Sequence, residues 1–595
     1  MKNKILSFIF AICLVMPCMF IMTACGEKGA PKYNVVLNGN DGVSSNTIQV
    51  TEGEQVAWPT NPVKENYDFV GWTTDAEGEN FWNFKSSVTG NLNLYAQFVE
   101  DDVYEYELST DGNSYIIVGA KAGLTKVVTP LTHLGKPVTE IGDMAFSEYY
   151  EDPDLGLSMR GNENITQIIL NPSIVKVGEG AFSHCKNVES IFMYDSVTTI
   201  ETSAFQEIEK LKSLTLSNSL TTLNVMAFTF CTSLEKVTIP ESLTYISQRC
   251  FNNCTSLKEV VLHDKLTQIK DAAFGECSSL KTITIPSSVT SIGIGALMHT
   301  DITSVTLGEN VTSLGDYVFW GCDSLTTATI NARLTKLPKE TFKGCTSLTT
   351  VNLPNTIETI SQSAFEDCVN LTSLTLPSSC TTISYYAFKN CEKLETFTFN
   401  NVLERIDIEA FKGCSFKIES LPSTLSYIGD KAFLTFEQED VCFEFPSTLR
   451  YIGEEVFSSD AMQNFCIDNL PVELKHIGGL SINGSRFGIE INVPSGTETI
   501  YEQAFYRAEL EDVVLPKGVE RIEREAFRYS TICSINIPST VTYIGPYAFA
   551  DCPNLTTIIF ETDGNVEIDE NAFTNSTSLK TLIIPNGTTA IADYA

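Results

Sequence analysis

A sequence motif of about 23 residues recurs along most of this chain, and this repetition constrains the fold more than any other feature. One copy reads CTSLTTVNLPNTIETISQSAF (345–365), and the next reads CVNLTSLTLPSSCTTISYYAF (368–388). In this part of the chain a phenylalanine closes each copy, at positions 319, 342, 365, 388 and 411. A period of roughly 20 to 30 residues with leucines at fixed offsets indicates a solenoid, in which each repeat buries its apolar face only against its neighbours.

The repeated motif also predicts the structure of one turn of the solenoid. Leu348, Val351 and Leu353 have the spacing of a short strand, and Pro354 ends it because proline cannot donate to a hydrogen-bond ladder. The residues that follow, up to Phe365, return the chain and fill the interior. The closing slot recurs, mostly at intervals of 22 to 24 residues, at 146, 182, 205, 228, 251, 274, 297, 319, 342, 365, 388, 411, 433, 457, 480, 505, 527, 549 and 573. We therefore predict a solenoid of about 19 turns over residues 104–595, with short parallel strands and irregular returns.

The open end of such an array needs a cap. Residues 104–108 and 115–118 alternate like strands around Asp111-Gly112-Asn113, a combination that is typical of a hairpin. We expect residues 104–146 to comprise this N-terminal cap and the first repeat.

A separate small domain is expected before the array, at 33–99. Three of the four tryptophans (Trp58, Trp72 and Trp82) lie in it, and a small domain needs large aromatic side chains to bury enough area. With YDFVGW at 67–72 and LYAQF at 94–98, this segment resembles the Listeria–Bacteroides repeat, also called the internalin B-repeat. The resemblance implies a β-grasp-like domain that acts as a spacer or weak adhesive unit on bacterial surface proteins.

The amino terminus has the features of an export signal. Lys2 and Lys4 precede an apolar run that ends in Ala24-Cys25. The run Met22-Thr23-Ala24-Cys25 resembles the lipobox of bacterial lipoproteins, although Met22 stands where leucine is usual. The resemblance implies cleavage of the signal peptide 1–24, a diacylglyceryl group on Cys25 and a tether over 25–32. The alternative is an uncleaved anchor, because about 20 apolar residues can span a bilayer.

The full repeat pattern, L-x-x-[IV]-x-[IL]-P followed by [LIV]-T-x-I-[GS]-x-x-A-F-x-x-C, resembles the BspA-like class of leucine-rich repeats from about residue 104 to the end. The resemblance implies a leucine-rich-repeat solenoid on a cell-surface or secreted protein of bacteria or some protists. Several members of that class are adhesins for host matrix proteins or for other microbes. A fold does not fix a function, so the ligand stays open.

The charge balance and the motifs weigh against several functions. The chain has 74 Asp and Glu against 39 Lys and Arg, a formal net charge of −35, and such a surface repels phosphate backbones. The five histidines occupy no common repeat slot, and no HExxH, Walker loop, GxSxG or GxGxxG is present. We expect no nucleic-acid partner, no enzymatic activity, no catalytic residue, no metal and no cofactor.

Ten of the eighteen cysteines share one slot, three residues after the closing position. They are Cys185, Cys231, Cys254, Cys277, Cys322, Cys345, Cys368, Cys391, Cys414 and Cys552. Equivalent side chains on stacked turns point in parallel and lie about 4.8 Å apart, which is too far for the Cβ atoms of a disulfide. We predict a column of reduced, buried thiols.

Two outward-facing features are candidate binding surfaces. One is a column of threonines between inward strand residues, Thr215, Thr238, Thr284, Thr306, Thr329, Thr375 and Thr398, although threonine also simply suits a strand. The other is an insertion of about 13 residues within 147–163, which we expect to form an acidic loop. Its candidate contact residues are Tyr149, Tyr150, Glu151, Asp152 and Asp154.

Two functions remain open at this point. The chain is either a lipid-anchored, monomeric surface protein that binds an extracellular protein or glycan, or a structural spacer of the envelope that displays a C-terminal module. The last residues, PNGTTAIADYA, stop at Ala595, where the next residue should be a closing phenylalanine. We therefore expect the native chain to continue.

Overall fold

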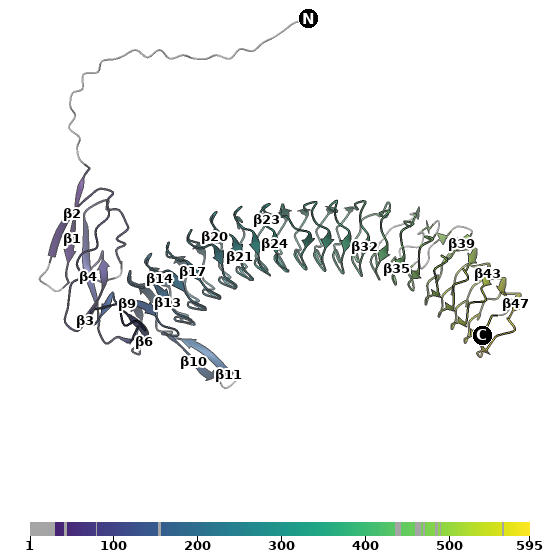
Figure 1. Ribbon diagram of the computed structural model, residues 1–595, viewed down its shortest axis with the longest axis horizontal. Helices are drawn as coiled ribbons and strands as arrows, with labels where there is room; N and C mark the ends of the chain where they lie inside the picture. Colours follow the sequence, from purple (N-terminus) through teal and green to yellow (C-terminus); the bar gives the residue numbers. More distant parts are fainter. Residues whose placement is uncertain are drawn as a thin grey trace, which may run out of the picture. The chain divides into compact units, whose positions relative to one another are not determined.

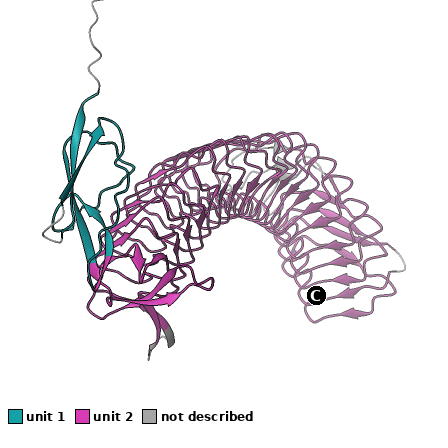
Figure 2. Cartoon of the chain, turned by 60° about the vertical axis from the view of Figure 1, so that its left-hand side comes forward, with its two compact units in different colours: residues 1–65, 69–98 teal, residues 66–68, 99–595 magenta. Residues whose placement is uncertain are grey.

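The computed structural model describes residues 30–40, 45–78, 80–152, 156–434, 442–457, 466–467, 470–481, 486–487, 490–561 and 564–595. The chain divides into two compact units, residues 1–65 with 69–98, and residues 66–68 with 99–595 (Figure 2). The described part of both units consists of strands and turns, without a helix.

The first unit is a four-stranded mixed sheet. Its strands are β1 (Lys32–Asn38), β2 (Ser45–Thr51), β3 (Tyr67–Thr73) and β4 (Leu92–Glu100), in the order β2-β1-β4-β3. β1 pairs antiparallel with β2 and parallel with β4. Val35, Leu94 and Trp72 are buried in its core, as expected for a small domain that relies on large side chains.

The second unit is the predicted solenoid, in which each turn has two strand-bearing faces and one corner (Figure 1). In one turn, β27 (Thr350–Asn352) lies on the first face, β28 (Thr359–Ile360) lies on the second face, and the chain then passes the closing Phe365. We call the segment around the closing residue the Phe corner. Strands on each face pair in parallel with their equivalents in neighbouring turns, at an offset of one repeat.

The strands of the first face are β7 (Lys126–Val128), β12 (Gln167–Leu170), β14 (Ser190–Met193), β16 (Ser213–Thr215), β18 (Lys236–Thr238), β20 (Glu259–Val261), β23 (Ser304–Leu307), β25 (Thr327–Ile330), β27, β29 (Ser373–Thr375), β31 (Thr396–Thr398), β34 (Cys442–Phe443), β36 (Cys466–Ile467), β38 (Arg486–Phe487), β39 (Glu490–Asn492), β41 (Asp512–Val514), β43 (Ser534–Ile537), β45 (Thr557–Phe560) and β47 (Thr581–Ile583). Those of the second face are β9 (Lys136–Ile141), β13 (Lys176–Val177), β15 (Thr199–Ile200), β17 (Thr222–Leu223), β19 (Tyr245–Ile246), β21 (Gln268–Ile269), β22 (Ser291–Ile292), β24 (Ser313–Leu314), β26 (Lys336–Leu337), β28, β30 (Thr382–Ile383), β32 (Arg405–Ile406), β33 (Tyr427–Ile428), β35 (Tyr451–Ile452), β37 (His476–Ile477), β40 (Thr499–Ile500), β42 (Arg521–Ile522), β44 (Tyr543–Ile544), β46 (Glu567–Ile568) and β48 (Ala590–Ile591).

The closing phenylalanines form a column of stacked rings through the core, with breaks where another residue closes the turn. Neighbouring ring centroids lie 4.7–5.9 Å apart, and the rings are within 14° of parallel. Leu297 interrupts the column and is fully buried in its place. The prediction of Leu480 as a closing residue is wrong: Leu480 is half-buried and has φ of 55°, which places it in the slot two residues before the closing position, and position 482 lies outside the described residues. The predicted use of the closing slot as the core is confirmed.

The cysteine column is confirmed as a set of buried, free thiols. In each of the ten turns, the thiol donates to the carbonyl of the closing residue one turn earlier, at 3.0–3.6 Å between sulfur and oxygen. Ser576 occupies the same slot and donates to the Phe549 carbonyl at 2.6 Å. The slot therefore favours a small side chain with a donor, although the buried Ile208 and Ala508 occupy it in two turns. Burial raises the pKa of Cys185 to about 12, which keeps its thiol protonated at neutral pH.

The Phe corner has its own hydrogen-bond ladder. In the turn closed by Phe205, the backbone N–H groups of Ser203, Phe205 and Glu207 donate to carbonyls of the next turn at 2.8–3.0 Å. Ser203 and Glu207 have φ of 55° and 58°, and most other turns repeat this pair of left-handed residues two positions before and after the closing residue. Such a backbone costs a side-chain-bearing residue about 1–2 kcal/mol. The inter-turn hydrogen bonds offset that cost.

The predicted cap is present. β5 (Tyr104–Leu108) and β6 (Tyr115–Ala120) form an antiparallel hairpin, and β6 pairs in parallel with β9. β8 (Thr132–His133) pairs antiparallel with β9. The Tyr104 hydroxyl accepts from the N–H of Val128 and donates to its carbonyl, so that its buried ring covers the first turn of the core.

The insertion differs from the expected loop. β10 (Ser147–Asp152) and β11 (Gly156–Gly161) form an antiparallel hairpin whose register pairs Tyr149 with Met159. The reason is cross-strand pairing, because Arg160 lies opposite Glu148 and donates to its carboxylate at 2.6 Å.

Candidate binding site

The predicted threonine column lies on the outward side of the first face. Its threonines are exposed, apart from the half-buried Thr329, and pairs such as Thr306 and Thr329 stand opposite each other in the parallel ladder. Val261 and Asn352 interrupt the column. No side-chain hydrogen bond engages its hydroxyl groups among the residues that the structure describes, so these groups face solvent.

Other threonines in the array use their hydroxyl groups internally. Thr326 donates to the carbonyl of Thr303 at 2.9 Å, and Thr349 donates to that of Thr326 at 3.1 Å. On the second face, Thr267 donates to the carbonyl of Thr244 at 2.9 Å. The column that contains Thr306 is therefore distinct in offering donors and acceptors to a partner.

The hairpin residues form a separate surface. Tyr149 is 57% exposed, and the Arg160 guanidinium lies 5.3 Å from the ring centroid of Tyr150. The side chains of Glu151 and Asp152, and all of Asp154, lie outside the described residues, as does Cys25. The hairpin leaves the array immediately after Phe146, at a Phe corner, whereas the threonines lie on the first face. The structure does not bring the two sets together.

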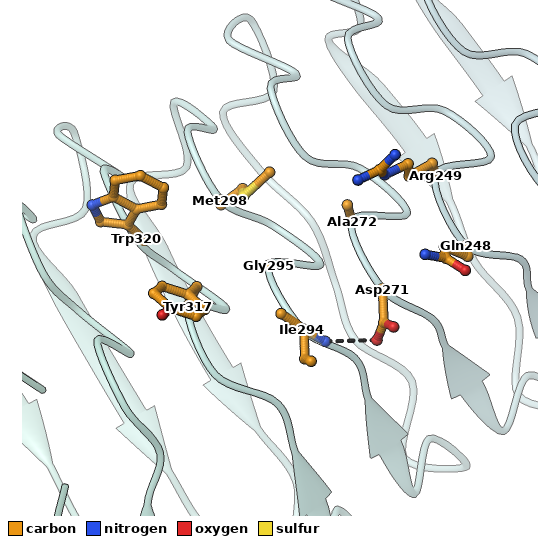
Figure 3. A pocket seen from close by; sticks show the side chains of 9 residues that line it. All are labelled: Gln248, Arg249, Asp271, Ala272, Ile294, Gly295, Met298, Tyr317 and Trp320. Atoms are coloured by element: carbon orange, nitrogen blue, oxygen red, sulfur yellow. Dashed lines mark hydrogen bonds between the residues drawn. The ribbon is translucent and has the colours of Figure 1, made fainter. Parts of the chain in front are cut away.

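A third feature, which the sequence reasoning missed, is a hollow of about 290 Å³ beside the Phe corners of four successive turns (Figure 3). Its lining consists of Gln248, Arg249, Asp271, Ala272, Ile294, Gly295, Met298, Tyr317 and Trp320. It arises two positions before the closing residue, where Arg249 and Tyr317 carry long side chains but the turns between them carry Ala272 and Gly295. We call this feature the Trp320 hollow.

The walls of the hollow differ in character. Trp320 packs at 4.6 Å against the His299 ring and at 6.0 Å from the Tyr317 ring, so one wall is aromatic. At the other end, the Arg249 guanidinium and the Gln248 amide extend toward Ala272 and Asp271 (Figure 3). One carboxylate oxygen of Asp271 accepts from the N–H of Ile294 at 2.8 Å. The sequence contained one signal that could have pointed to this hollow, because Trp320 is the only tryptophan outside 33–99.

Two further observations concern the described residues only. They contain no group of three or more His, Cys, Asp or Glu side chains arranged to hold a metal ion. They also contain no helix that is long and apolar enough to cross a membrane.

Comparison with protein families identifies both units. The family described as "BspA type Leucine rich repeat region (6 copies)" matches residues 159–281, 267–395, 381–508 and 475–595. The Listeria-Bacteroides repeat domain matches residues 33–97.

Individual relatives are distant. A protein of Evansella cellulosilytica described as a Gly-rich membrane protein is 30% identical over 86 residues, which are 14% of this chain and only 10% of that protein. A leucine-rich repeat protein of Bacteroides ovatus is 19% identical, with a TM-score of 0.32 over 82% of this chain and 89% of that one. A leucine rich cell surface protein of Faecalibacterium prausnitzii is 21% identical, with a TM-score of 0.35 over 78% and 94%.

Proposed function

The chain belongs to the BspA-type leucine-rich repeat family, and on this premise we propose that it is a lipid-anchored adhesin that binds an extracellular protein or glycan without enzymatic activity. Proteins of this family are extracellular or surface-associated. The lipid on Cys25 holds the mature chain at the membrane, and the monomeric solenoid presents its outward surfaces to the ligand.

The observation that supports binding most directly is the column of free threonine hydroxyls on the first face. The backbone beneath these side chains is fixed by ladder hydrogen bonds, and Leu374 and Leu376 on either side of Thr375 are buried. A rigid surface loses little conformational entropy when it binds, so regularly spaced hydroxyls are suited to a polar macromolecule. The net charge of −35 favours ligands other than polyanions.

Binding is tested by screening the purified chain against extracellular matrix proteins and a glycan array. The triple variant T306D/T329D/T375D places three carboxylates on the threonine column and is expected to weaken binding of the ligand identified with the parent. The matched control S313D/T359D/T382D adds the same charge on the second face. Equal binding by both variants and the parent removes the column from the site. Failure of the parent to show saturable binding favours an envelope spacer.

The anchor is tested separately in cells. Mass spectrometry of the protein extracted from the membrane fraction is expected to find a diacylglyceryl group on Cys25 and residues 1–24 removed. If the extracted protein instead keeps its first 24 residues and carries no lipid on Cys25, an uncleaved apolar anchor holds it.

A further inference from the structure

The Trp320 hollow lies where two successive turns carry a small residue in a slot that most other turns, apart from those of Gly180, Ser203 and Ser363, fill with a larger side chain. The slot two residues before the closing residue holds Tyr317, Tyr386 or Tyr547 in other turns, each with φ between 56° and 62°. In the hollow the same slot holds Ala272 and Gly295, with φ of 48° and 57°. The backbone is therefore the same, and only the covering side chains are missing.

The size of the hollow fits a small part of a larger ligand. Arg249 and Tyr317 are three turns apart, which corresponds to about 14 Å at the roughly 4.8 Å spacing of stacked strands. The volume of about 290 Å³ is at the lower end for a ligand pocket. One or two six-membered sugar rings match this length and volume.

The aromatic end leaves apolar surface in contact with water. Ile294 at the rim is 51% exposed, and Trp320 and Tyr317 are only half-buried. Trp320 packs against the His299 ring, and this contact restricts the motion of the indole before any ligand binds. A flat apolar ring at the edge of a polar surface is a platform for the C–H face of a sugar.

The opposite end offers unused planar polar groups. Within the described residues, no ion pair or hydrogen bond engages the Arg249 guanidinium, whereas Arg405 and Arg528 each pair with a carboxylate. Asp271 has a second carboxylate oxygen beyond the one that accepts from Ile294. Guanidinium, amide and carboxylate groups can each exchange hydrogen bonds with vicinal hydroxyls.

We propose that the Trp320 hollow binds one or two pyranose rings of an uncharged glycan, with one ring against Trp320 and Tyr317 and hydroxyl groups on Arg249, Gln248 and Asp271. This inference rests on the proposed function, because it takes the solenoid as the binding part and names the ligand class of one site. The acidic net charge disfavours a polyanionic glycan. Sugar hydroxyls use both the donors and the acceptors of the polar end, whereas an apolar peptide side chain uses neither.

The decisive variant fills the hollow without altering the backbone. Gly295→Tyr restores the side chain that other turns carry at this slot, and the nearest atom to an added Cβ is the sulfur of the flexible Met298, at 2.8 Å. Lys431→Tyr places the same residue at the same slot of a distant turn, with φ of 56°, and is the matched control. Arg249→Ala removes an exposed polar group and tests the other end.

The experiment titrates the full chain with lactose, cellobiose and N-acetyllactosamine, with heparin and an apolar peptide as comparisons, and follows tryptophan fluorescence and calorimetric heat. At least one neutral disaccharide is expected to bind the parent saturably. Gly295→Tyr is expected to weaken the affinity for that disaccharide about tenfold or more, and Arg249→Ala is also expected to weaken it. Lys431→Tyr is expected to leave the affinity unchanged. Tighter binding of heparin or of the peptide overturns the inference, as does the absence of sugar binding.

The two proposals fail in different ways. If the parent binds an extracellular ligand in the wider screen and Gly295→Tyr binds it equally, the hollow is not the site but the adhesin function stands. If the parent binds nothing, both proposals fall. Circular dichroism of each variant separates loss of binding from loss of fold.

Discussion

Replacing Phe365 by alanine is expected to open the array locally rather than to unfold it as a whole. The Phe365 ring is fully buried and stacks at 5.4 Å on Phe342 and at 5.1 Å on Phe388. Removing a buried phenylalanine ring costs about 3–5 kcal/mol, because the transfer free energy is lost and a cavity remains. In a solenoid that cost falls on the turn itself and on its contacts with the two neighbouring turns.

Native-state hydrogen exchange followed by mass spectrometry measures this effect turn by turn. A loss of about 4 kcal/mol raises the local opening equilibrium by roughly three orders of magnitude, since each 1.4 kcal/mol is tenfold. The reporter amides are those of Phe342, Phe365 and Phe388, whose N–H groups donate to carbonyls of the following turn at 2.8–2.9 Å. Peptides from the distant turns 505–573 are expected to keep their protection.

Two controls separate the buried column from the residue type. Phe230 is 40% exposed, so Phe230→Ala is expected to change stability by no more than about 0.5 kcal/mol. Phe365→Leu is expected to cost much less than Phe365→Ala, because Leu297 fills the same slot in the native chain. Unchanged protection around residue 365 in Phe365→Ala, or an equal loss in the distant turns, would refute the reasoning.

Three further predictions concern the slots around this column. Because the described thiols are free and nearly all buried, iodoacetamide mapped by mass spectrometry is expected to label the half-exposed Cys533 first among them in the native state, and rapid labelling of Cys345 would contradict the burial of the cysteine column. Cys345→Ala removes one of the two donors to the Phe319 carbonyl, which still accepts from the N–H of Cys322, and is expected to cost about 0.5–1.5 kcal/mol, whereas Cys345→Ser is expected to cost less; urea midpoints decide between them. The hydrogen bond from His184 lowers the pKa of Glu207, so the ionised carboxylate stabilises the fold above about pH 4.3 and this contribution is lost as the pH falls through the lowered value. Glu207→Gln is therefore expected to lower the urea midpoint at pH 6, and the difference from the parent is expected to disappear as the pH falls through the lowered pKa of Glu207.

The inward slots of this fold could be predicted because each of them constrains residue type in every turn. Phenylalanine at 365 and cysteine at 368 recur with the period because both face the interior, where volume and polarity are fixed by the turns above and below. The sequence did not predict that the thiol is a hydrogen-bond donor. That role depends on the closing carbonyl, which accepts two hydrogen bonds: the Phe342 carbonyl, for example, accepts from the N–H of Cys345 in its own turn and from the thiol of Cys368 in the next.

Features set by the backbone alone, or by several turns together, could not be predicted. The left-handed slot holds Ser203, Met226, Arg249, Ala272 and Gly295 in successive turns, so no residue type reveals it. Thr326 and Thr329 are three residues apart and look equivalent in the sequence, yet the first donates to Thr303 and the second faces outward. The inserted hairpin was missed because its pairing depends on cross-strand contacts that a single sequence does not display.

The difference between the constrained inward slots and the variable outward slots also indicates where the array can recognise a ligand specifically. The stacked interior forces every turn toward the same shape, so a ligand can distinguish one turn from another only by outward side chains. In the turns from Arg249 to Tyr317, two consecutive small residues, a leucine at the closing position and the only tryptophan of the array coincide. The hollow lies beside the Phe corners and the threonine column lies on the first face, so the Gly295→Tyr and T306D/T329D/T375D variants perturb separate surfaces. If both variants weaken the binding of one ligand, that ligand must contact both the hollow and the threonine column. Such a ligand is larger than a disaccharide.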